Sequence, residues 1–185
     1  MIELIPHLVA SLVALGMLGG MLWLFWQGPP YLPSQDATIT DMIALARIRP
    51  GAKGRPGTRV AELGSGDGRL AIALAHAGAQ VDGYEFNPYL VWRARRNVRR
   101  AGVADRVRIY RRNFWRIDFR DRGYEAVTTF GVPHIMKRLG RKLRAELPPG
   151  ARVVSNAFPI PGLPKGPKTK RAFSYIIVPP KRRLG

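Results

Sequence analysis

Two stretches of the chain combine glycines with carboxylates in the pattern that α/β proteins use to hold a nucleoside-containing cofactor. Val60–Arg69 predicts a strand that leads into a turn with glycine at positions 64, 66 and 68. Val81–Glu85 predicts a second strand, which ends on an acid about twenty residues after that turn. The turn lets the main chain approach a ligand, and the acid can accept hydrogen bonds from a ribose diol. We therefore expect a cofactor site on the ends of two neighbouring strands.

The spacing of the glycines favours S-adenosylmethionine over a nicotinamide dinucleotide. The dinucleotide fingerprint G-x-G-x-x-G places its third glycine one position later than Gly68. Glycines can adopt positive φ and lie against the methionine part of the cofactor, while the helix that starts near Arg69 directs its first N–H groups at the ligand's carboxylate. The cofactor-binding residues predicted in this part of the chain are Glu62, Gly64, Ser65, Gly66, Gly68 and Glu85.

The two acids have different expected roles. Glu62 can orient the ammonium group of the cofactor, directly or through water, and Glu85 can accept two hydrogen bonds from the ribose hydroxyls. An alternative for Glu85 is structural, because its carboxylate could cap the helix that Asn87-Pro88 begins. The glycine turn lies at the right distance upstream for ribose binding, so we favour the first interpretation.

The elements that must position these residues alternate along the chain. We expect helices over 36–49, 70–77, 88–101 and 136–147, and strands over 59–63, 80–85, 107–110, 125–130, 151–158 and 172–178. The order predicts a doubly wound, mainly parallel, Rossmann-like α/β sheet of the class I methyltransferase type. In such a sheet the ligand and the reacting groups lie at the carboxyl edge of the strands.

Two further segments follow strands of this predicted sheet. Asn113 and Phe114 come after the third strand, where an amide and a ring could bind the edge and the face of adenine; a surface loop is the alternative. Gly131 comes after the fourth strand and is assigned to the cofactor site. The three residues that follow it, Val132, Pro133 and His134, are the predicted catalytic residues, and no metal is expected among them.

The chemistry expected there is methyl transfer from a sulfonium to a nitrogen, which depends mainly on positioning and desolvation. A tight turn at 131–134 would offer backbone carbonyls to an amine nucleophile. A lysine ammonium must first lose its proton, and a weakly polar pocket beside a cationic sulfonium lowers its pKa. His134 could take that proton, or it could be an ordinary hydrogen-bonding histidine, because a strong general base is not required.

The first part of the chain predicts a membrane anchor. Leu8–Trp26 has no charged side chain, and as a helix it would span about 28 Å, close to the hydrocarbon thickness of a bilayer. Its aromatic end, 23–26, is typical of a lipid–water interface. A secretory signal peptide would need a basic leader, whereas this leader carries Glu3. A helix buried in a soluble core is the other alternative. We expect an anchor over 1–28, a linker and helix over 29–57, and the methyltransferase domain over 58–185.

Charge is distributed unevenly along the 185 residues. None of the 31 Lys and Arg residues precedes Arg47, and nine of the 12 acids follow it, so residues 47–185 carry a net charge of +22. The positive-inside rule places such a body on the cytoplasmic side of a membrane, or on the matrix side in an organelle. Its basic surface could meet anionic lipid or nucleic acid, or serve only solubility; for a tethered domain we favour lipid. The absence of cysteine excludes a disulfide framework and thiolate chemistry.

Four motifs occur in an order that resembles one known family. They are E-L-G-S-G-D-G-R at 62–69, G-Y-E-F-N-P-Y-L-V-W at 83–92, Y-R-R-N-F-W-R-I-D-F at 110–119 and F-G-V-P at 130–133. They look like the membrane-anchored seven-β-strand lysine methyltransferases that modify the ATP synthase c-subunit and the adenine nucleotide translocase in mitochondria. The resemblance reaches Phe158 and includes an apolar N-terminal segment followed by prolines. It implies an S-adenosylmethionine-dependent protein-lysine N-methyltransferase whose target lysine belongs to a membrane or membrane-associated protein.

The chain departs from that family in two respects. Asn113 stands where an aspartate is usual, and the C-terminal part is short and strongly basic. The high content of Arg, Ala and Gly suggests a bacterial relative, and with the anchor this predicts a single-pass protein of a bacterial inner membrane.

Two other functions remain open. An RNA or DNA methyltransferase would explain the basic body, but the chain lacks the Asn/Asp-Pro-Pro-Tyr motif after the fourth strand, and without cysteine it cannot methylate cytosine C5 through a thiolate. A membrane-tethered module that binds the cofactor or anionic lipid without catalysis is the other possibility. In that case altering Pro133 or His134 would leave the biological activity intact.

Overall fold

The structure is a computed structural model in which residues 4–26, 36–52 and 56–178 are described. The chain divides into two compact units, Met1–Leu32 and Pro33–Gly185. The predicted linker at 29–33 lies outside the described residues, and the division at residues 28 and 57 stays a prediction.

The described part of the first unit is the helix α1 (Leu4–Trp26). Its residues 9–20 are exposed, among them large apolar side chains such as Leu12 and Met17. Over the described residues, no helix meets the length and apolarity of a membrane span.

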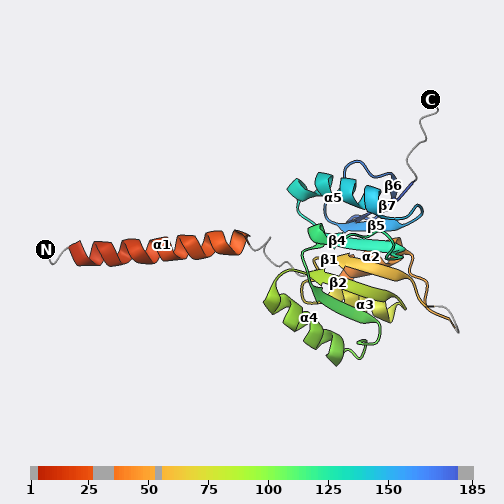
Figure 1. Ribbon diagram of the computed structural model, residues 1–185, viewed down its shortest axis with the longest axis horizontal. Helices are drawn as coiled ribbons and strands as arrows, with labels where there is room; N and C mark the ends of the chain where they lie inside the picture. The colour runs from red at the N-terminus through yellow and green to blue at the C-terminus, as the bar shows by residue number, and fades with distance from the viewer. Residues whose placement is uncertain (1–3, 27–35, 53–55, 179–185) are drawn as a thin grey trace. The chain divides into compact units, whose positions relative to one another are not determined.

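The second unit is built on one sheet of seven strands (Figure 1). They are β1 (Arg59–Leu63), β2 (Gln80–Glu85), β3 (Val107–Arg111), β4 (Ala126–Phe130), β5 (Arg152–Asn156), β6 (Lys165–Lys168) and β7 (Ala172–Ile176). Their order across the sheet is β3-β2-β1-β4-β5-β7-β6. Strands β1 to β5 are parallel, whereas β7 runs antiparallel to both of its neighbours. The sheet is therefore mixed, with a parallel body and a C-terminal hairpin at one edge.

Helices cover both faces of this sheet. They are α2 (Asp36–Ala46), α3 (Arg69–His76), α4 (Pro88–Arg100), α5 (Pro133–Glu146) and the short 3-10 helix η1 (Phe114–Arg116). One core joins α2, α3 and α4 to the sheet through side chains such as Met42, Leu74 and Val98. The other core lies under α5 and includes Leu139 and Phe119. Because both faces are covered, the central strands are buried almost throughout and show no apolar–polar alternation.

Strand register brings the carboxyl ends of the central strands to one edge. Leu63 of β1 pairs with Tyr84 of β2 on one side and with Thr129 of β4 on the other. Neighbouring β4 and β5 end together, since Phe130 pairs with Asn156. The chain order reverses between β1 and β4, and open α/β sheets bind their ligands at such a switch point.

The structure differs from the sequence expectations most clearly at β6 and at the start of α5. β6 lies inside 159–170, where the sequence analysis lists no strand, because its K-G-P-K sequence carries no strand signal. Helix α5 begins at Pro133 and not at 136, since proline fits the first helical position. Two arginines of α4 are bound to the domain, since Arg95 donates to the Ile109 carbonyl and Arg93 pairs with Asp67.

The packing of α5 gives a stability prediction. Leu139 is fully buried, so Leu139→Ala should lower the free energy of unfolding by about 2–5 kcal/mol. Arg141 lies on the same helix but is exposed, and Arg141→Ala should change it by less than about 0.5 kcal/mol. Urea denaturation followed by circular dichroism measures both. Equal effects of the two substitutions would contradict the assigned orientation of α5.

Candidate cofactor and catalytic site

The glycine turn is held against the tip of β2 by main-chain hydrogen bonds. The N–H groups of Gly64 and Ser65 donate to the Tyr84 carbonyl at 2.8 and 3.2 Å. The N–H of Gly66 donates to Oε2 of Glu85 at 3.0 Å. The turn after β1 and the acid at the end of β2 are therefore in direct contact, as their predicted roles require.

Positive φ angles and close packing explain why this turn needs glycine. Gly64, Gly66 and Gly68 have φ of 80°, 56° and 83°, a region that side chains with a Cβ rarely occupy. A Cβ on Gly68 would also lie only 3.1 Å from Cβ of Ala94 in α4. The turn is thus enclosed between β2 and the buried side of α4.

Small residues also set the packing beneath the turn. Ser65 is buried, and it lies over Gly83 of β2. A Cβ on Gly83 would approach Oγ of Ser65 to 2.4 Å, so that strand can carry no side chain at this position. Ser65 therefore contributes its main-chain N–H and its small size to the turn.

Asp67 belongs to the same turn, and the sequence analysis did not single it out. Its buried carboxylate lies 3.1 Å from the guanidinium of Arg69 and 3.7 Å from that of Arg93. Its carbonyl accepts a hydrogen bond of 2.9 Å from Nδ2 of Asn97. Asp67 thus joins the start of α3 to the middle of α4. An acid inside a glycine turn, followed two residues later by arginine, was the available signal.

Glu62 is a buried acid just before the turn, and its Oε2 has no hydrogen-bond partner among the described residues. Burial raises the pKa of its carboxyl well above the usual value, and the nearby negative charge of Glu85 raises it further. A cation placed against Oε2 would relieve both effects. The ammonium group of a methionine moiety is such a cation, so this residue fits the predicted cofactor.

Glu85 makes three hydrogen bonds to the main chain. Besides Gly66, the N–H groups of Phe86 and Asn87 donate to its Oε1 at 2.8 Å each. The helix α4 is capped by Asn87 itself, whose Oδ1 accepts from Tyr89. Glu85 therefore stabilises the turn and the residues that lead into α4. This role is similar to the alternative in which its carboxylate caps that helix. A carboxylate offers about four acceptor positions, so the ribose role stays a prediction beside this one.

The segment predicted to bind adenine lies beside Glu85. The N–H of Arg112 donates to the Glu85 carbonyl at 3.0 Å. Asn113 caps η1, because its Oδ1 accepts a hydrogen bond of 3.0 Å from the N–H of Trp115. Phe114 is half-buried, and its ring lies 4.9 Å from that of Trp115. Asn113 thus uses its carbonyl oxygen locally, as an aspartate could at the same position.

The predicted catalytic residues form the start of α5. Gly131 is buried, and a Cβ there would lie 2.4 Å from Sδ of Met136. The carbonyl of Val132 accepts from the N–H of Ile135 at 3.1 Å, so it is already engaged in the first helical turn.

Pro133 and His134 follow and are exposed. Within the described part of the chain, the side chain of His134 makes no hydrogen bond or ion pair. These residues lie at the carboxyl edge of the sheet, and the structure shows no positioned base among them.

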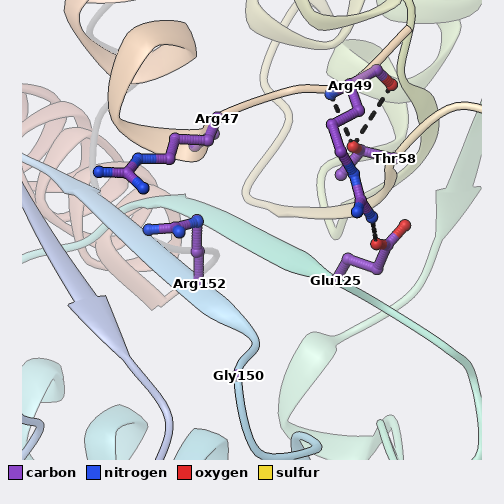
Figure 2. A pocket seen from close by; sticks show the side chains of 7 residues that line it. Arg47, Arg49, Thr58, Glu125, Gly150 and Arg152 are labelled. Carbon is purple, nitrogen blue, oxygen red and sulfur yellow. Dashed lines mark hydrogen bonds and ion pairs between the residues drawn. The ribbon is translucent and has the colours of Figure 1, made fainter.

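Two further observations concern the rest of the domain. No group of three or more His, Asp or Glu among the described residues could hold a metal ion. A cavity of about 360 Å³ lies at the opposite, amino edge of the strands (Figure 2). Arg47, Arg49 and Arg152 line it, and Arg49 pairs with Glu125. Burial, and then the charge of Arg47, lower the pKa of Arg152.

The order of the strands, the glycine turn and Glu85 at the tip of β2 together define a class I, Rossmann-like methyltransferase domain. A solved structure agrees: the RNA methyltransferase from Salinibacter ruber in complex with S-adenosyl-L-homocysteine has a TM-score of 0.70 and 29% identity, over 81% of this chain and 97% of that one. Residues 62–166 match the ANTKMT methyltransferase domain family, and the chain belongs to it.

Curated relatives agree with this assignment. The chain is 39% identical over 132 residues to the Xenopus laevis lysine N-methyltransferase of the ATP synthase c-subunit, covering 71% of this chain and 54% of that one. It is 39% identical to the adenine nucleotide translocase lysine N-methyltransferase of Mus musculus, over 80% and 63% of the two chains. A protein-lysine N-methyltransferase of Saccharolobus islandicus is 32% identical over 72% and 79%. The matched region covers only 54% and 63% of the first two relatives, and the predicted methyltransferase family is confirmed, whereas the membrane anchor stays a prediction.

The buried Glu62 predicts a pH dependence of stability in the ligand-free protein. Its folded-state pKa is raised, so its contribution to stability is present below the unfolded pKa and is lost as pH rises through the folded pKa. Glu62→Gln removes this titration. The wild type should therefore lose stability relative to the variant as pH increases from the ordinary glutamate pKa of 4.5. Urea denaturation at a series of pH values measures the difference, and parallel stability curves would contradict the prediction.

Proposed function

We propose that the chain is an S-adenosylmethionine-dependent protein-lysine N-methyltransferase that acts on a membrane or membrane-associated protein. The observation that carries the proposal is the contact between the glycine turn and Glu85, next to the buried Glu62 whose Oε2 lacks a partner among the described residues. Curated relatives of the chain are lysine methyltransferases with different protein substrates, which supports a lysine as the target.

Several residues would hold the cofactor, which supplies a methyl group on a positively charged sulfur. The carboxylate of Glu62 would face its ammonium group, and the glycine turn would lie against its methionine part. The N–H of Arg69, the first of α3, already donates to Oδ1 of Asp67 at 3.3 Å, so the carboxylate of the cofactor would be bound by the N–H groups at this helix start that no side chain accepts. Glu85 would bind the ribose, and Asn113 and Phe114 would bind the adenine.

The residues at the start of α5 would receive the lysine. Gly131 is buried and Pro133 exposed, so the segment leads from the core of the site to its surface within three residues. A lysine side chain entering there must lose a proton before it can react, and desolvation lowers its pKa. The exposure of His134 lets that proton pass to the imidazole or to solvent, so the residue contributes little as a dedicated base.

A membrane location is the second part of the proposal. α1 is 23 residues long, its described side chains at 9–20 are uncharged, and no Lys or Arg precedes Arg47. We infer that α1 anchors the chain in a single pass, with the basic domain on the cytoplasmic side of a bacterial inner membrane and in contact with anionic lipid.

An RNA substrate is the competing proposal. The Salinibacter ruber RNA methyltransferase is covered over 97% of its length, more than any lysine methyltransferase named above. Against it, the chain at the end of β4 reads F-G-V-P-H over 130–134 and lacks the motif that amino-methylating nucleic-acid enzymes use to stack a target base. The lysine proposal is therefore stronger.

Cofactor binding tests the role of Glu85. Two hydrogen bonds to a charged group are together worth about 3 kcal/mol or more, so Glu85→Gln should raise the Kd for S-adenosylmethionine at least about 100-fold. Glu125→Gln is the matched control, because Glu125 lies at the amino edge in the pair with Arg49. Isothermal titration calorimetry measures both. An unchanged Kd in a folded Glu85→Gln protein would leave Glu85 with its main-chain role alone.

Methyl transfer tests the activity itself. The full-length protein in lipid is incubated with radiolabelled S-adenosylmethionine and membranes from source cells that lack the gene. We expect label on a lysine of one membrane protein, located by mass spectrometry and absent with Glu85→Gln. Label that survives protease but is removed by nuclease would establish the RNA proposal instead. Cofactor binding without any transfer would indicate a binding module.

A further inference from the structure

Three aromatic side chains stand exposed beside the cofactor turn. Phe86 directly follows Glu85, and Tyr89 and Trp92 lie in the first two turns of α4. Their exposed fractions are 53%, 61% and 53%. In the described part of the second unit, Val178 is the one other large apolar residue with comparable exposure. Exposing such rings to water is unfavourable, and a contiguous group of them marks an interaction surface.

The exposed rings continue into a line of arginines on the same side of α4. Val91, Ala94 and Val98 form the buried side of the helix. Tyr89, Trp92 and Arg96 are spaced by three and four residues, so they share the opposite side. The rings of Tyr89 and Trp92 are 6.0 Å apart, and the guanidinium of Arg96 lies 5.5 Å from the ring centre of Trp92.

This side of α4 has strong positive charge and no compensating acid. The helix contains five arginines and no aspartate or glutamate. Arg93 and Arg95 are bound to the domain, through Asp67 and the Ile109 carbonyl. The remaining three are exposed and make no ion pair with any described residue. We call the surface formed by Phe86, Tyr89, Trp92, Arg96, Arg99 and Arg100 the α4 face.

We propose that the α4 face docks the domain on the surface of an anionic bilayer. Aromatic rings favour the interface between lipid and water, and arginines are attracted to anionic headgroups. The α4 face offers both along one helix, with rings at the start and arginines toward the end. An RNA strand would need a groove that tracks its backbone between stacking rings, whereas these side chains cover the outer surface of a helix. Charge and shape therefore favour a membrane.

Docking in this way would bring the candidate site to the membrane surface. Phe86 is adjacent to Glu85, and its N–H donates to that carboxylate at 2.8 Å. If the first turns of α4 lie on the bilayer, Glu85 and the glycine turn beside it are held near the lipid headgroups. A lysine at the end of a membrane-embedded segment would emerge at that height. In this respect the inference rests on the proposed function, although the docking itself does not require catalysis.

Site-directed spin labelling of the full chain tests the docking. The chain has no cysteine, so Tyr89→Cys provides a single attachment site. Ala145→Cys, at an exposed position of α5, is the matched control. The labelled proteins are reconstituted into vesicles of phosphatidylcholine alone or of phosphatidylcholine with phosphatidylglycerol. In the anionic vesicles the label at 89 should gain contact with oxygen and lose contact with an aqueous nickel chelate. The label at 145 should stay aqueous.

Charge reversal on the α4 face provides the second arm. Each arginine near an anionic surface contributes about fivefold to the docked population, so Arg96→Glu, Arg99→Glu and Arg100→Glu together should reduce it at least about 100-fold. Calorimetric binding of S-adenosylmethionine should be unchanged in the same variant, which shows that the site is intact. A label at 89 that stays aqueous in anionic vesicles, or the same signal after charge reversal, would overturn the proposal.

The alternatives give different outcomes. Immobilisation of the label at 89 by single-stranded RNA, without any change in anionic vesicles, would assign the α4 face to nucleic acid. Insertion at 145 instead of 89 would place another side of the domain on the membrane and overturn the proposal. If the α4 face docks on the membrane but no lysine is methylated, the docking proposal stands and the proposed enzymatic function is refuted. If a lysine is methylated while the label at 89 stays aqueous, the docking proposal alone is refuted.

Discussion

The candidate site depends on the way in which main-chain donors tie the end of β1 to the end of β2. The Tyr84 carbonyl and the Glu85 carboxylate together accept N–H groups from Gly64, Ser65 and Gly66. These bonds require the turn to curl back over β2, which requires positive φ and therefore glycine. They also fix Glu85 where it accepts the first N–H groups after β2, and so set where α4 begins. Turn, acid and helix are one assembly.

Within a chain of net charge +19, this assembly concentrates negative charge. Asp67 is matched by arginines on α3 and α4, and Glu85 by main-chain donors. Glu62 is buried nearby with an oxygen that no described residue satisfies. A positively charged ligand is therefore attracted to one position of the site, although the surface around it repels cations.

Much of this architecture was predictable because its signals are local. Short apolar runs mark the central strands, glycines mark the turn and a proline marks the start of α4, so β1, β2 and the start of α4 were predicted where the structure has them. β6 was not, because it forms only by pairing with β7 and its sequence shows no strand pattern. The hydrogen bonds of Glu85 and the ion pairs of Asp67 depend on contacts between distant segments, which spacing in the sequence does not reveal.

The contact between Gly68 and Ala94 has a mechanical consequence. A Cβ on the glycine would be 3.1 Å from that of the alanine, so the main chain of the turn packs directly against the small Ala94 and leaves no room for a side chain between them. Well-packed contacts of this kind transmit strain. Asp67 links the same two elements through Arg93 and Asn97. The helix and the turn therefore form one rigid piece, so the position of the glycine turn is set by the packing of α4 as much as by its hydrogen bonds to β2.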